Sequence, residues 1–162
     1  MPAIGRLIAS LSFGWIDSYA YPVPYVVSQL TGAYQSTPDF LATKHPIESA
    51  ADAEAYLARL DAFAREVGHD TGRARDDLKR GILPPDFVAD KALRQLKALR
   101  AQSGEESTLV NSLAQRTAEQ GIAGEWGARA RRIVDGPIAA ALDAQIALVS
   151  EQRARASHEA GI

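Results

Sequence analysis

Three histidines, His45, His69 and His158, are the side chains of this sequence that are best suited to bind a metal or to transfer a proton. None is accompanied by further ligands at metal-binding spacing on a shared helical face. Residues 158–162, HEAGI, begin like the His-Glu-x-x-His helix of zinc enzymes, but the fifth position is an isoleucine. We therefore expect no metal site and no cofactor site within this chain.

Other polar residues also lack the neighbours that catalysis requires. Asp76 and Asp77 are adjacent, and adjacent positions on a helix point away from each other, so this pair suits a solvated face. Ser28, Ser36 and Thr37 have no Gly-x-Ser-x-Gly setting and no histidine and aspartate placed beside them. The sequence thus predicts no catalytic residue.

A cluster of aromatic and amide side chains near the N-terminus is the remaining candidate for a binding function. Its members are Tyr21, Tyr25, Gln29 and Tyr34, which we consider as residues that contact a substrate or a partner. Tyrosine rings are amphipathic and suit either a ligand groove or the half-buried surface of a packed segment. Both interpretations stay open, and packing is the more common one.

This cluster lies in an arm, residues 19–46, whose composition differs from the rest of the chain. Four of the eight prolines lie between residues 21 and 46, and seven of the eleven aromatic residues lie between Phe13 and Phe40. Proline fixes φ, removes a hydrogen-bond donor and pushes the preceding residue towards extended geometry, so the run YPVP at residues 21–24 cannot be helical. We expect an irregular arm that packs on a helical body.

The residues after the arm follow the pattern of amphipathic helices. Ser49 and Asp52 form a variant of the capping box, which predicts a helix over residues 50–67. Gly68 is expected to end that helix, and Asp70 is expected to cap a second one that runs to about residue 80.

Other predicted helices have weaker signals. Thr37-Pro38-Asp39 predicts a short helix over residues 38–44, and Phe87 is expected to face inward from a helix over residues 86–100. Further helices are expected over residues 3–16, 107–120 and 122–157, the last interrupted at Gly136-Pro137. The fold class is therefore all-α: a bundle of about six to eight helices with an irregular Tyr/Pro-rich arm near the N-terminus.

Length and composition indicate one domain. The 162 residues are expected to form a single helical domain, with an N-terminal helix in residues 1–18, the arm in 19–46 and a helical body in 47–162. The net charge of −2 argues against nucleic acid as a partner. The chain has no cysteine, and no apolar run approaches the length of a membrane span.

The N-terminus has two interpretations. Arg6 precedes a largely apolar run, and Ser18-Tyr19-Ala20 resembles a signal-peptidase site, which together form a weak secretion signal. A short amphipathic helix joined to the arm is the favoured alternative, because a lone arginine makes a poor n-region. The compartment stays open, with a preference for the cytoplasm.

Six blocks in order resemble one family. They are YPV at residues 21–23, SQLTG at 28–32, PDFL at 38–41, HPI at 45–47, DAEAYLARL at 52–60 and RGILPP at 80–85. Read together, they resemble the N-terminal half of the bacterial domain-of-unknown-function 885 family, and the resemblance extends from about residue 19 to 162. Members of that family are longer, mostly helical, and regarded as zinc metallopeptidases whose His-Glu zinc helix lies well downstream.

The resemblance implies a scaffold without chemistry of its own. No zinc ligand or catalytic glutamate of the family matches a residue here, so zinc is implied for the full-length family only. The first hypothesis is therefore a non-catalytic segment of a zinc-dependent peptidase, inactive alone. Its partners would be the missing catalytic half or a second copy, through exposed apolar surface. The alternative is a stand-alone helical interaction module whose Tyr-rich arm forms a groove for a peptide or protein.

Overall fold

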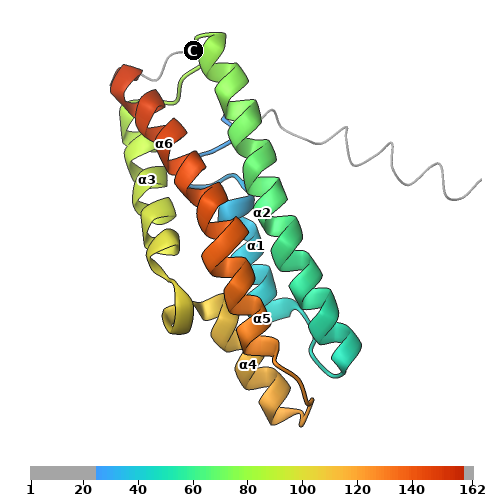
Figure 1. The fold of residues 1–162 in the computed structure, drawn as a ribbon. Coiled ribbons are helices and arrows are strands. Elements are labelled where there is room, and N and C mark those ends of the chain that lie inside the picture. Colours follow the sequence, from blue (N-terminus) through green and yellow to red (C-terminus); the bar gives the residue numbers. More distant parts are fainter. Residues whose placement is uncertain (1–24, 159–162) are drawn as a thin grey trace, which may run out of the picture.

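The computed structural model describes residues 25–158, which form a helical bundle without β-strands (Figure 1). The predicted all-α class is confirmed. These residues form five continuous helices and one 3₁₀ turn, Gly104–Glu106. The elements are α1 (Ala33–Asp39) with the π-helical turn η2 (Phe40–Lys44), α2 (Ala50–Lys79), α3 (Asp86–Ala101), α4 (Thr108–Glu119), and α5 (Trp126–Ile133) joined through the π-helical turn η4 (Val134–Ile138) to α6 (Ala139–Arg155).

The core is organised around α6, which lies between α2 and α3 in Figure 1, with α1 behind. Leu60, Leu96 and Leu142, from α2, α3 and α6, are all buried. Two buried glutamines add polar ties: the side-chain amides of Gln145 and Gln152 donate to backbone carbonyls of α2, each at 3.4 Å. Amide donors thus join apolar packing in holding α6 against α2.

The continuous helix Trp126–Arg155, which contains α5, η4 and α6, is long and apolar enough to cross a membrane by length and composition alone. Central helices of helical bundles meet the same criterion, because they are apolar on more than one side. In this fold Ile138, Leu142 and Val149 of that helix are buried in the bundle core.

The start of α2 matches its prediction. The backbone N–H of Asp52 donates to the Ser49 hydroxyl at 3.3 Å, and the Asp52 carboxylate accepts from the Ser49 N–H at 2.9 Å. The carboxylate also accepts the Glu48 N–H at 3.0 Å. Hydrogen bonding to the Ser49 side chain and to these amides holds the pKa of Asp52 below its usual range. This reciprocal capping box satisfies amides that the first turn leaves without partners.

The end of α2 differs from its prediction, because the helix continues through Gly68 to Lys79. Thr71, Ala74 and Leu78 continue the buried stripe. Their packing outweighs the helix penalty of two glycines, Gly68 and Gly72, about 1 kcal/mol each. The helix ends at Gly81 instead, where φ is +78° and the Ile82 N–H donates to the Asp77 carbonyl at 2.9 Å, as in a Schellman motif.

One proline prediction was wrong and another holds in part. Pro38 does not begin a helix: α1 begins at Ala33, and Pro38 lies inside it, one residue before its end. Pro137 lies within η4, so the α-helical pattern is interrupted at the predicted place, but the helix is not split in two. Proline removes one helical hydrogen bond, and a π-helical turn absorbs the local mismatch without ending the helix. Residues 25–158 form five helices, and the helix expected over residues 3–16 lies outside the described residues, so the predicted number of six to eight is not confirmed.

Replacing the capping serine tests the start of α2. We expect Ser49→Ala to lower the free energy of unfolding by about 1 kcal/mol, because an amide of the first turn loses its acceptor. Urea denaturation followed by circular dichroism measures the change. Ser36→Ala, at an exposed position inside α1, is the matched control. An equal effect of both variants would contradict a capping role.

Candidate functional site

Residues 25–32 form the irregular part of the described arm. The Ser28 N–H donates to the Thr31 carbonyl at 3.2 Å, and the hydroxyls of these two residues lie 2.7 Å apart. The Thr31 hydroxyl also donates to the Tyr25 carbonyl at 3.0 Å. The arm is thus a turn held by its own side chains, as serine and threonine allow. From Ala33 to Lys44 the chain is helical, so the helix predicted within the arm over residues 38–44 begins five residues earlier than expected.

Tyr34 anchors the arm inside the bundle. It is buried, and its hydroxyl lies 2.5 Å from the Ser28 carbonyl and 2.9 Å from the Gln95 side-chain oxygen of α3. Burial raises the pKa of Tyr34 to about 12. The carboxylate of Asp70, predicted to cap its own helix, instead accepts the Ala33 N–H at 2.8 Å and so caps α1. Packing and hydrogen bonding therefore explain the role of Tyr34, and no ligand is needed to explain it.

Tyr25 lies at a groove between the arm and the loop that joins α2 to α3. The groove has a volume of about 430 Å³, and its lining residues are Tyr25, Gly81, Ile82, Leu83, Pro84, Arg155 and Ser157. Ile82 remains 44% exposed. Phe87, predicted to face inward, is 41% exposed and packs edge-on against the His158 ring at 5.9 Å. Apolar side chains therefore gather at this end of the bundle.

The four predicted contact residues do not share one surface in this structure. Tyr21 lies outside the described residues. Tyr25 lines the groove and Tyr34 is enclosed, while Gln29 is half-buried in the turn, where its side-chain oxygen has no partner in residues 25–158. Ile82 to Pro84 were missed as site residues, because the run of two prolines indicated only a helix break. Their block RGILPP was nevertheless one of those that carried the family resemblance.

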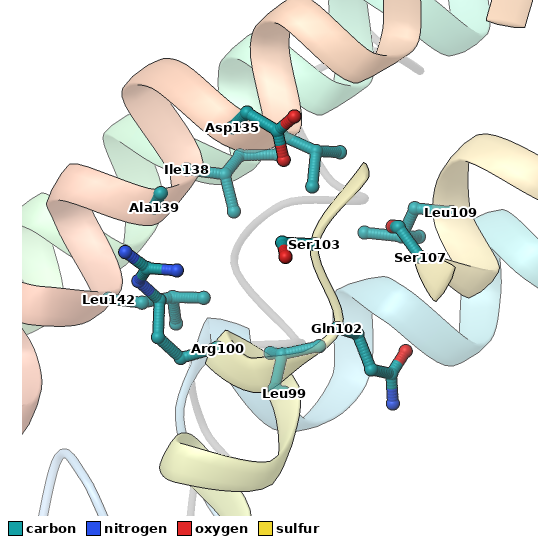
Figure 2. A pocket seen from close by; sticks show the side chains of 11 residues that line it. Leu99, Arg100, Gln102, Ser103, Ser107, Leu109, Asp135, Ile138, Ala139 and Leu142 are labelled. Atoms are coloured by element: carbon teal, nitrogen blue, oxygen red, sulfur yellow. The ribbon is translucent and has the colours of Figure 1, made fainter. Parts of the chain in front are cut away.

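A second cavity lies where α3 ends and α4 begins (Figure 2). Leu99, Ile138 and Leu142 are among the residues that line it, and the side chain of Ser103 lies between them and Ser107. Its volume is about 10 Å³. That volume holds about one water molecule. The cavity is therefore a packing feature and too small for a substrate.

His45 closes a corner between η2, α2 and α4. It is 1% exposed, its Nδ1 lies 2.6 Å from the Pro46 carbonyl, and its ring packs edge-on against Tyr56 at 5.4 Å. The Arg116 guanidinium donates to the His45 carbonyl. Within the described part of the chain, His45 Nε2 and one Arg116 nitrogen have no partner. Burial lowers the pKa of His45, and the charges of Arg59 and Arg116 lower it further.

Nothing in this corner completes a metal site. No three histidine, aspartate or glutamate side chains gather within reach of one ion in residues 25–158. The residues present here therefore do not fit a zinc site. His45 is a structural residue whose neutral form suits its surroundings.

Acidification tests this assignment. Because the folded state lowers the pKa of His45, the unfolded state binds the proton more readily below its pKa of about 6.5. We expect the free energy of unfolding to fall as the pH decreases from about 7 to about 5, and this dependence to weaken in His45→Gln. Urea denaturation across that range measures it, with the exposed His69→Gln as control. Equal pH dependence in wild type and His45→Gln would contradict the assignment.

Comparison with known proteins places the chain in a family. A crystal structure described as "the putative lipoprotein from Colwellia psychrerythraea" has the same fold, with a TM-score of 0.79 and 20% sequence identity. The match covers 86% of this chain but only 25% of that one, so this chain spans about a quarter of its length. No curated protein matched. The model of the family described as "Bacterial protein of unknown function (DUF885)" matches residues 5–161, and the chain therefore belongs to this family.

Proposed function

We propose that this chain is the non-catalytic helical scaffold of a longer zinc-dependent peptidase, and that it is inactive alone. The observation that carries the proposal is the length relation: the fold is shared with a solved chain, of which it corresponds to only a quarter. The sequence blocks that resemble a family regarded as zinc metallopeptidases support peptide hydrolysis as the reaction of the longer protein. The described residues gather no metal ligands, so the catalytic groups belong to the additional polypeptide.

The arm supplies the second part of the proposal. Tyr25 and Gln29 are both half-buried, so the turn that carries them keeps side-chain surface that contacts substrate once the catalytic part is present. In a longer family member, we expect replacement of the counterparts of Tyr21, Tyr25 and Gln29 by alanine to lower kcat/KM, with the enclosed Tyr34 left in place. Steady-state kinetics with a peptide substrate measures it, and thermal unfolding shows whether the variant is folded. An unchanged kcat/KM would contradict a contact between the arm and the substrate.

The purified chain tests the scaffold proposal directly. We expect the 162-residue protein to hydrolyse no peptide in a fluorogenic peptide library, with or without added zinc, because residues 25–158 bring no three metal ligands together to hold a metal-bound water. Fluorescence release measures turnover, and a zinc peptidase in the same assay is the positive control. Turnover that a chelator abolishes and zinc restores would overturn the proposal.

A stand-alone interaction module is the second candidate. It is favoured by the groove itself, since a volume of about 430 Å³ suits a side chain or a short peptide. A module binds a peptide without further polypeptide, whereas a scaffold wall does not. Peptide binding by the isolated chain, measured by calorimetry and lost in Tyr25→Ala but not in Leu30→Ala, would favour this candidate.

A further inference from the structure

We propose that the groove beside Tyr25 is the face on which the additional polypeptide of longer family members docks. The inference rests on the proposed function and deepens it, because it names the surface that joins the scaffold to the remaining chain. The expected occupant is an apolar segment of that polypeptide with a carboxylate beside it.

Apolar exposure singles out this face. The large apolar side chains that remain exposed among the described residues are Leu30, Phe40, Ile82 and Phe87. Ile82 lines the groove, and Phe87 is the second residue of α3, just after the loop that contributes to the groove. Phe40 is instead covered in part by the Arg59 guanidinium at 5.6 Å, and Leu30 is the tip of a tight turn. The groove is therefore the apolar surface best placed to be covered by a partner.

The course of the chain points to the same face. Tyr25 and Ser157, near the two ends of the described residues, both line the groove. The Asp86 N–H donates to the Ser157 carbonyl at 3.1 Å, and the His158 ring lies 3.0 Å from the Asp86 carboxylate. Figure 1 shows the end of α6 at the same end of the bundle as the α2–α3 loop. Polypeptide that continues from this point in a longer relative reaches the groove through a short connection.

Charge at the rim defines the chemistry of the occupant. Arg155 lines the groove, and the exposed Arg80 precedes its lining residue Gly81. The Arg155 guanidinium lies 3.6 Å from Glu151, where both side chains are exposed, so this pair leaves the cation accessible to a second carboxylate. An apolar side chain seated between Tyr25 and Ile82, with an aspartate or glutamate beside it, complements this surface.

Cysteine labelling tests the state of the groove in this protein, because the natural sequence has no cysteine. We expect the thiol of Ile82→Cys to react with Ellman's reagent within about tenfold of the rate of Leu30→Cys, since the proposed occupant belongs to longer chains only. Protection by more than about tenfold at every protein concentration would assign the groove to residues 1–24. Protection that grows with concentration would assign it to a second copy. Either result overturns the proposal.

The longer relative supplies the other half of the test. Superposition of residues 25–158 on the Colwellia crystal structure should place polypeptide from outside the matched quarter over the counterparts of Tyr25, Ile82 and Pro84. Contact over another face alone would overturn this inference and leave the scaffold proposal in place. Hydrolysis by the 162-residue chain would overturn the scaffold proposal whatever the superposition shows, so the two failures are distinguishable.

Discussion

The packing of α6 against both α2 and α3 holds the bundle together. The positions of the other helices depend on these two contacts. Leu142, Leu148 and Val149 are buried in this arrangement. The side chains of Gln145 and Gln152 are equally enclosed, and each finds a carbonyl on α2. A buried N–H donor without a partner is costly, so these two hydrogen bonds favour one rotation and one shift of α6 along α2. The side-chain oxygen of Gln145 has no partner among the described residues. Apolar burial supplies the stability, and the two amides favour one register.

The apolar core around α6 is closed on one side by a cover that α1 and the arm form. Val27, Tyr34 and Leu41 are buried in that cover. Hydrogen bonds join it to both outer helices, from Ala33 to Asp70 of α2 and from Tyr34 to Gln95 of α3. The arm therefore completes the core, and this explains why Tyr34 is enclosed while Tyr25, at the edge of the cover, reaches a groove.

Local sequence signals were sufficient wherever the structure depends on neighbours in sequence. The capping box at Ser49, the helix that begins at Asp86 and the stop at Gly81 all follow from residues within one or two turns. Gly68 and Pro38 were misread because packing against other helices decides whether a weak helix residue is tolerated. The packing of one helix against another cannot be read from a single sequence.

The groove illustrates the same limit. Tyr25 was a candidate from the sequence, but Ile82 to Pro84 and Arg155 meet it only through the return of α2 and α6 to one end of the bundle. Asp70 was likewise identified as a capping residue, yet the helix that it caps begins 37 residues earlier. Residue type predicted the kind of interaction in both cases, and only the fold determined the partner.

The number of charged residues in its walls separates this groove from another large depression of the described surface. The groove of about 380 Å³ between α2 and α5 is lined by Glu54, Asp61, Arg129 and Arg132, together with Leu57, Ala58 and Ile133. Glu54 and Arg129 already form an ion pair at 2.6 Å. Covering that surface would remove several charged groups from water, which offsets much of the gain from contact. The groove beside Tyr25 has one charged lining residue, Arg155, so covering it removes fewer charged groups from water.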